Sequence, residues 1–342
     1  MKTNESRSSK LSLVALATAM LVACGGGGGG TDAAPVPVAE VPKAPVVLAS
    51  SIVTSVPDAM YPLGSEEAAA FALLNDQRGR CGFGLLAQNA MIDNAAKAHA
   101  DYQLVHNIRS HLENLTEFPL GFTGVAPQDR IAFQGYTNWG ASNEEFATTW
   151  GVTSKIGQGE QDIRGLLNAP YHLAALVGSS REVGVAVRSS LDVGATYETV
   201  ITQVNLANTA TQGPQLQASN DVLTYPCEGV TGVDFELTDE VPNPVVGRDL
   251  STQPIGSSVY IRLRPGNILS VTSASMVNAA TGAQVKLRDV VGQSNDPHRR
   301  FGSNAAYVAA DAPLARATQY RVSLTGTNDG VAFNRSFVFT TR

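Results

Sequence analysis

The stretch that most constrains the fold is residues 166–187, which read LLNAPYHLAALVGSSREVGVAV. Its start favours a short helical piece that ends at Pro170, because proline interrupts helical hydrogen bonding. His172 follows two residues later, and the alternating valines of the final VGVAV run predict a strand. A histidine held between a helix end and a strand can point rigidly into a groove. We therefore expect the upstream chain to supply partners for His172.

Those partners are few, because four of the five histidines lie between residues 99 and 172. The segment RSHLENL carries His111, and GYTNWGASNEEFATTW carries Glu144. Two imidazoles and one carboxylate suffice to bind zinc with an open position for water. Such a site lowers the pKa of the bound water and can drive hydrolysis. His99 falls on the apolar face of a helix predicted over roughly residues 89–106, which favours a buried core histidine over a ligand.

Residues 1–23 predict a secretory signal. Three basic residues precede an apolar run at 11–22, which is too short to span a bilayer. The run ends in Leu-Val-Ala-Cys, which resembles the lipobox of bacterial lipoproteins and implies acylation of Cys24. An ordinary cleaved signal with a chance cysteine is the alternative.

Several acyl chains on Cys24 would anchor the chain firmly, whereas one chain binds weakly. Gly25 after the cysteine indicates the outer membrane of a bacterial cell envelope. Residues 24–57 hold six consecutive glycines and then spaced prolines, which predict a flexible tether.

Composition argues against nucleic-acid binding. The whole chain has 24 basic and 30 acidic residues, and removal of residues 1–23 leaves 21 and 29, a net charge of about −8. Cys81 and Cys227 form an even pair in an oxidising compartment, which predicts a disulfide. Two separate buried thiols are the alternative.

Residues 241–342 show short alternating apolar runs separated by turn signals such as Pro-Gly-Asn at 265–267 and Asn-Asp-Gly at 328–330. This spacing predicts an antiparallel β-sandwich. Residues 313–322 resemble the tyrosine-containing approach to a late strand in bacterial Ig-like modules. No chemical motif occurs in this part, so we expect it to act as a spacer, with adhesion as the alternative. Residues 208–240 are expected to be a linker.

An ordered set of landmarks runs through residues 66–206. Residues 73–100, LLNDQRGRCGFGLLAQNAMIDNAAKAHA, combine an Asn/Arg helix, a glycine break and an alanine-rich helix that ends in His-Ala. The later landmarks are Ser110-His111, Asp129-Arg130, Gly135-Tyr136, Glu144, Pro170-Tyr171-His172 and the Glu-Val-Gly-Val-Ala run at 182–186. This set resembles the CAP, or SCP-like, superfamily.

The resemblance implies an α+β chain in which a CAP-like α-β-α sandwich, residues 58–207, precedes the Ig-like all-β sandwich. It also implies an exposed cleft containing His111, Glu144 and His172, and metal binding is known in some family members. The chain departs from the family pattern at Glu145, where asparagine is usual. The family's second glutamate is also missing, and Asp162 is the nearest substitute for it.

We therefore expect a membrane-anchored protein, on the cell surface or in the periplasm, whose cleft binds a ligand. A divalent metal such as zinc, a lipid, a cell-wall component and a protein are the candidate ligands. The alternative is a metal-assisted, peptidase-like hydrolase that uses Glu144 as general base and His111 and His172 as metal ligands. A third interpretation is that these side chains only brace one another. The HExxH and GxSxG patterns are absent, so no motif supplies a reaction.

Overall fold

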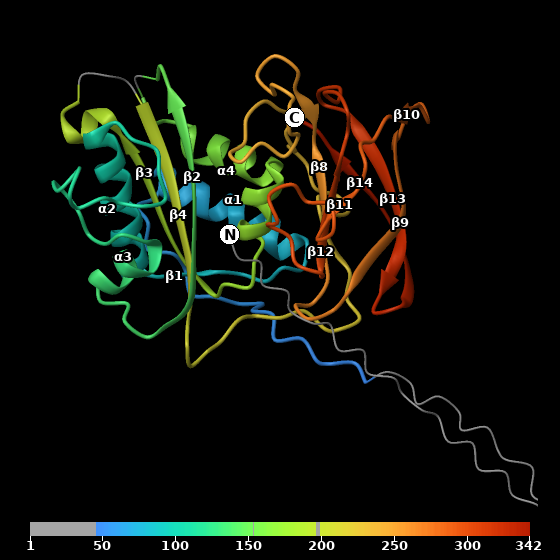
Figure 1. Ribbon diagram of the computed structural model, residues 1–342, viewed down its shortest axis with the longest axis horizontal. Coiled ribbons are helices and arrows are strands. Elements are labelled where there is room, and N and C mark those ends of the chain that lie inside the picture. The colour runs from blue at the N-terminus through green and yellow to red at the C-terminus, as the bar shows by residue number, and fades with distance from the viewer. Residues whose placement is uncertain (1–45, 153, 196–198) are drawn as a thin grey trace, which may run out of the picture. The chain divides into compact units, whose positions relative to one another are not determined.

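The computed structural model describes residues 46–152, 154–195 and 199–342 (Figure 1). The five α-helices of these ranges all lie before residue 177, and the chain beyond residue 199 contains strands and no α-helix. The fold class is therefore α+β, as predicted. The predicted signal segment, Cys24 and the glycine run lie outside the described residues. Within the described ranges, no helix is long and apolar enough to cross a membrane.

The helical part is organised around a four-stranded sheet with the order β1-β3-β4-β2. Its strands are β1 (Ala87–Gln88), β2 (Trp139–Trp150), β3 (Glu182–Ser189) and β4 (Thr199–Thr209). The short β1 runs parallel to β3, and the other pairs are antiparallel. Residues 183–187 of β3 are all buried, so the predicted VGVAV strand lies inside the sheet. In contrast, β2 forms an edge of this sheet.

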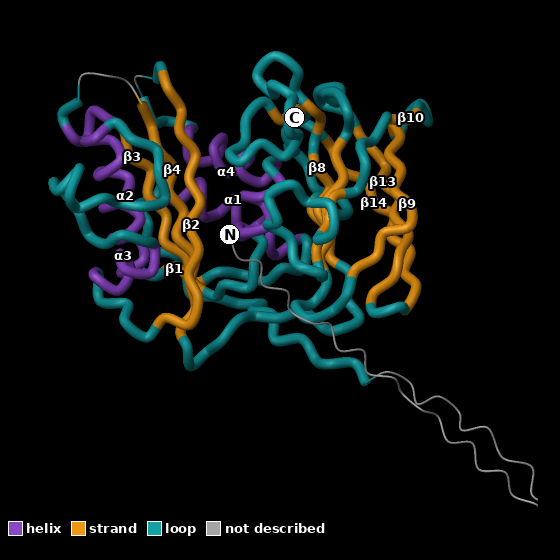
Figure 2. The backbone as a smooth tube through the Cα atoms, viewed as in Figure 1, coloured by secondary structure: helices purple, strands orange, loops and turns teal. Residues whose placement is uncertain are grey.

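Helices cover both faces of the sheet (Figures 1 and 2). One face carries α2 (Ala90–His106) and α3 (Pro127–Phe133), and the other carries α1 (Glu66–Arg80), α4 (Gln158–Asn168) and α5 (Pro170–Leu176). A short 3-10 helix, η1 (Ser190–Val193), follows β3. The close approach of α2 to β3 requires glycine at Gly184, because a Cβ there would collide with the backbone of Ile92 and Asp93.

The helix boundaries follow local signals with one correction. Ser65 caps α1 by accepting a hydrogen bond from the Ala68 amide, and Asn89 caps α2 in the same way. The expectation that a helical piece ends at Pro170 was wrong, because Pro170 is the first residue of α5. Proline is favoured at that position, since the first helical amide needs no partner. His172 therefore lies in the first turn of a helix and not in a loop.

The second part of the chain, from residue 223 onward, contains two four-stranded antiparallel sheets, as predicted from the alternating runs. One sheet has the order β10-β9-β13-β14 and the other β11-β12-β8-β5. The first contains β9 (Leu269–Asn278), β10 (Gln284–Val285), β13 (Gln319–Asn328) and β14 (Val331–Thr340). The second contains β5 (Leu223–Tyr225), β8 (Ser258–Arg262), β11 (Val291–Gly292) and β12 (Ala305–Ala309). A separate pair joins β6 (Glu236–Leu237) to β7 (Ile255–Gly256).

Two expected boundaries differ in the structure. Residues 208–240 are not a simple linker, because they contain β5 and β6 and bury Tyr225 and Val230. The flexible tether does not extend to residue 57. The Ser51 amide donates to the Leu216 carbonyl at 2.7 Å, which fixes this stretch to the body.

The two parts are joined covalently and through a shared core. The predicted disulfide between Cys81 and Cys227 is present. One cluster of buried apolar residues runs from Ala70 in α1 to Phe339 in β14. Residues 46–342 consequently form one compact unit, and the β-sandwich is not an independent spacer.

Candidate functional site

A cleft of about 1030 Å³ lies between the helical part and the β-sandwich. The loop after α2, the middle of β2 and α5 contribute one wall, while residues 241–242, β8 and residues 300–305 contribute the other. The histidines, glutamates and arginines in its lining are His111, Glu144, Glu145, His172, Arg262 and Arg300. All three residues predicted to form a cleft are therefore in its lining.

Glu144 sits on β2 and faces α2 and α3. Its Oε1 lies 3.2 Å from the Nδ1 atom of His111, and its Oε2 lies 2.5 Å from the Nη2 atom of Arg130. The Glu144 and Arg130 side chains are buried, whereas the His111 side chain is 47% exposed. His111 is thus the point at which this buried pair meets the solvent in the cleft.

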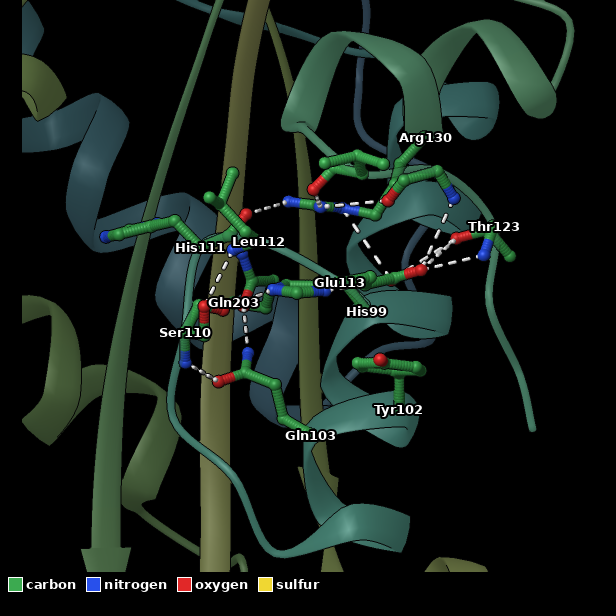
Figure 3. Close-up of polar contacts among 12 residues, drawn as sticks. His99, Tyr102, Gln103, Ser110, His111, Leu112, Glu113, Thr123, Arg130 and Gln203 are labelled. Carbon is green, nitrogen blue, oxygen red and sulfur yellow. Dashed lines mark hydrogen bonds and ion pairs between the residues drawn. The ribbon is translucent and has the colours of Figure 1, made fainter. Parts of the chain in front are cut away.

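Next to this pair, His99 and Glu113 form a second buried pair (Figure 3). The Nδ1 atom of His99 lies 2.9 Å from the Oε1 atom of Glu113, and its Nε2 atom lies 2.9 Å from the Ser110 carbonyl oxygen and 3.5 Å from Glu144. Both ring nitrogens face acceptors, and both can donate only when the imidazole is cationic. His99 is buried as predicted, but it also supports the cleft carboxylate.

These contacts determine the charge of Glu144. Burial alone would raise the pKa of its carboxyl, but the hydrogen bond with His111 and the charges of His99 and Arg130 outweigh burial and lower that pKa. Glu144 is consequently a stable carboxylate at neutral pH. If the His111 Nδ1 atom donates to it, the Nε2 atom of His111 is left as an acceptor toward the cleft.

His172 has different partners from those predicted. Its Nδ1 atom lies 3.2 Å from the Oε1 atom of Glu240, and its Nε2 atom lies 3.6 Å from the Oε2 atom of Glu145. Glu145 follows Glu144 on β2, so the two side chains point to opposite faces of the sheet. The structure therefore pairs His111 with Glu144 and His172 with Glu145 and Glu240, on the two sides of one strand.

Glu240 also caps α5. Its Oε1 atom accepts hydrogen bonds from the amides of Tyr171 at 2.7 Å and His172 at 3.3 Å, and the preceding residue, Ala169, provides no side-chain cap. A carboxylate at a helix N-terminus satisfies amides that have no partner within the helix. Burial raises the pKa of Glu240 in spite of these bonds. Burial, followed by the charges of Glu144 and Glu240, raises the pKa of Glu145 well above its usual range.

Asp162 does not take the place of a second cleft glutamate. Its side chain accepts hydrogen bonds from the hydroxyls of Thr202 at 2.6 Å and Thr149 at 3.1 Å, and it does not line the cleft. A four-residue cleft set that includes Asp162 is thus ruled out by its position. The carboxylates that lie beside His172 are instead those of Glu145 and Glu240.

The predicted zinc ligands are not gathered around one point. Among the described residues, no group of three or more histidine, cysteine, aspartate or glutamate side chains is arranged to hold a metal ion. His111 and His172 line the same cleft, but each is engaged with a different carboxylate. The described residues thus offer zinc no preformed site with three ligands.

Sequence reasoning missed Glu240 and Arg300, because it assigned no chemistry to the second part. Both follow the helical part by many residues and belong to no motif. Glu240 lies in the segment expected to be a linker, and Arg300 ends a turn-rich stretch. Nothing in the pattern around them signals that Glu240 contacts His172 or that Arg300 lines the cleft.

No protein-family model matches the chain, and no curated protein matches it either.

Proposed function

We propose that this chain is a lipid-anchored cell-envelope protein of the CAP superfamily whose cleft binds a ligand, with no established reaction. The observation that carries the proposal is the cleft of about 1030 Å³ with His111, Glu144 and His172 in its lining. Sites for small organic ligands commonly occupy about 300–1,000 Å³. The cleft is therefore large enough for such a ligand or for a short segment of a larger one.

Two features support the family assignment. A four-stranded sheet carries helices on both faces, which is the layering that the sequence resemblance implies. Two histidines 61 positions apart in sequence, His111 and His172, also line one cleft. For the second part, two stacked antiparallel sheets support an Ig-like architecture. Anchoring at Cys24 and location in the outer membrane rest on the sequence alone.

Binding is favoured over hydrolysis by the state of Glu144. A general base works best when its pKa lies near the operating pH. The pKa of Glu144 is lowered, and its two oxygens are already engaged by His111 and Arg130. A metal-assisted hydrolase also requires a metal site, and the described residues present none with three ligands.

The test is a thermal-shift screen of residues 46–342 against cell-wall fragments, short peptides and lipids. A ligand present at 100 times its Kd stabilises the folded state by about 2.7 kcal/mol, or a shift of roughly 5 °C or more. We expect that shift to disappear in Ala174→Trp, which fills the cleft from α5, and to persist in Ala280→Trp, which changes an exposed turn.

Three results would change the proposal. Absence of a shift with every class of ligand would remove it. Micromolar zinc binding that is lost in both His111→Ala and His172→Ala, with the fold intact, would replace it with a metal cleft. Turnover of any of these compounds that is lost in Glu144→Gln would replace it with the hydrolase.

A further inference from the structure

The edge of β2 offers unpaired backbone groups to the cleft. β2 has twelve residues and pairs with β4 alone. Within the described ranges, no backbone–backbone hydrogen bond joins its second edge to another strand or loop. Residues 143–145 of this strand line the cleft. A free strand edge of this kind is a template for another extended chain.

The register identifies which groups point outward. On β4, the carbonyl of Ala207 accepts a hydrogen bond from the Arg181 amide on the β3 side. The backbone N–H and C=O groups of the odd-numbered residues of β4 therefore face β3, and those of the even-numbered residues face β2. Their register partners on β2 are odd-numbered, such as Asn143 opposite Leu206. The backbone N–H and C=O groups of the even-numbered residues of β2 therefore point away from β4, toward the free edge. The residues with outward-facing backbone groups are therefore Glu144, which lines the cleft, and its neighbours Ser142 and Phe146 on either side.

One side-chain contact agrees with this assignment. The Glu144 amide donates to the Oδ1 atom of its neighbour Asn143 at 2.9 Å, and not to a β4 carbonyl. The amide oxygen of Asn143 thus occupies the position that a carbonyl of an added strand would take. An incoming chain can replace this local contact with a backbone hydrogen bond.

Across the cleft, Arg300 supplies a positive charge, which acts on the Glu145 carboxylate by lowering its pKa against the larger effect of burial. Its side chain is exposed, and its guanidinium has no hydrogen-bond partner in the part of the chain that the structure describes. Arg262, the other arginine of the cleft, is nearly buried and donates to the Val177 carbonyl and the Ser179 hydroxyl. Arg300 is therefore the arginine available to a carboxylate, which its planar guanidinium can bind through two parallel hydrogen bonds.

The rim of the cleft adds apolar contacts for side chains. Leu112 is 55% exposed on the wall of the helical part, and Val241 is 78% exposed on the opposite wall. Side chains of an extended chain alternate between its two faces, so an added strand would present apolar groups to both walls. Backbone pairing then supplies affinity, and these contacts supply selectivity.

We propose that the cleft binds an extended peptide segment that pairs with the free edge of β2 and places a carboxylate, such as its own C-terminus, on Arg300. This inference rests on the proposed ligand-binding function and names the class of ligand. A peptide fits because only a polypeptide backbone presents alternating donors and acceptors at the strand spacing.

The experiment uses residues 46–342 and an equimolar library of N-acetylated hexapeptides with free C-terminal carboxylates. Peptides retained by the protein are identified by mass spectrometry, resynthesised, and measured by calorimetry. Each is also made with an amidated C-terminus and with N-methyl groups on alternate residues in either of the two registers. N-methylation removes the donors from one edge of the peptide strand and leaves the other edge intact.

We expect a roughly tenfold or greater loss of affinity on C-terminal amidation and in Arg300→Ala. One N-methyl register should abolish binding and the other should retain it. Ser142→Pro, which removes one outward donor and keeps the β4 pairing, should weaken binding about tenfold, whereas Ser142→Ala should not. Hydrogen exchange should show new protection of the outward Ser142 and Phe146 amides when peptide is bound.

Circular dichroism and the retained disulfide establish that each variant is folded. The inference is overturned if no hexapeptide is retained. It is also overturned if binding is the same for both N-methyl registers and in Ser142→Pro, because the peptide would then lie elsewhere. If cleft-dependent shifts persist in the thermal screen while hexapeptides fail, the ligand-binding function stands and the peptide assignment falls.

Discussion

Replacement of Arg130 with methionine tests whether Glu144 is held as a buried anion. Both side chains are buried and their closest atoms are 2.5 Å apart, so solvent screens the pair little. Loss of one member of a buried ion pair costs about 3–5 kcal/mol, because an uncompensated charge remains inside. Arg130 also donates to the His111 carbonyl at 3.0 Å. We therefore expect Arg130→Met to lower the free energy of unfolding by about 4 kcal/mol.

A double variant distinguishes the free energy of the Arg130–Glu144 ion pair from that of the other contacts of the two side chains. Glu144→Gln keeps the shape of the side chain, and we expect it to cost about 1–3 kcal/mol. In Arg130→Met/Glu144→Gln neither member of the pair leaves an unpaired charge. The decrease in the free energy of unfolding should therefore be smaller than the sum of the two single decreases by about 2 kcal/mol or more. Urea denaturation of residues 46–342, monitored by fluorescence, gives the free energy of unfolding of the wild type, the two single variants and the double variant.

The pH dependence of the free energy of unfolding shows whether the folded structure favours or disfavours the charged form of Glu144. In the wild type the pKa of folded Glu144 is below its unfolded value, so its contribution to stability is present above pH about 4.5 and is lost as the pH falls through the folded value. Arg130→Met removes two interactions that lower this pKa, the charge of Arg130 and its hydrogen bond, and leaves the contributions of burial, His111 and His99. In that variant the pKa of Glu144 should lie above its wild-type value, so the loss of stability relative to the wild type should grow as the pH rises from 4 to 7.

The reasoning would be refuted by two results. One is a loss of less than about 1 kcal/mol in Arg130→Met. The other is a loss that does not grow between pH 4 and pH 7, or that grows equally in the double variant, where Glu144 is absent. Either result would mean that Glu144 is protonated or reaches solvent by another route.

Three further predictions concern the frame around the cleft. Replacement of Cys81 and Cys227 with alanine opens a loop closed over 146 positions and should cost about 4–5 kcal/mol in urea denaturation, and alkylation with and without reductant should show no free thiol in the wild type. Burial raises the pKa of Asp162 to about 6, so the contribution of Asp162 to stability should be complete below pH 4 and fall by roughly 2–3 kcal/mol as the pH rises from about 4 to above 6. Asp162→Asn should show no such fall in the same titration. Glu240→Ala leaves two helix amides and a histidine nitrogen unpaired and should cost about 2–4 kcal/mol by denaturation, whereas the exposed neighbour Asp239→Ala should cost less than about 0.5 kcal/mol.

Elements with strong local signals could be predicted from the sequence. Ser65 and Asn89 mark helix starts because their side chains can cap the first amides, and the VGVAV run marks a strand buried on both faces. The β-sandwich followed from period-two runs between turn residues. The disulfide followed from cysteine number and compartment.

The partners of His172 could not be predicted, because they depend on tertiary placement. A strand sends neighbouring residues to opposite faces, and the face that Glu145 takes becomes known only when β2 is placed in the sheet. Glu240 lies 68 positions after His172, and its capping of α5 leaves no mark in either segment. Pro170 illustrates a local ambiguity, since proline both ends one helix and begins the next.

The contacts of the β-sandwich change what the cleft can recognise. The helical part contributes to the cleft a histidine and a glutamate on each side of an edge strand. The second part adds Glu240 below His172 and Arg300 opposite β2, and it closes the groove into a volume of about 1030 Å³. Since a shared apolar core and a disulfide hold the two parts together, this wall is fixed and not a mobile neighbour. A ligand selected by the cleft must therefore satisfy both parts at once, so substitutions in either part, Glu145 or Arg300, should alter which ligands bind.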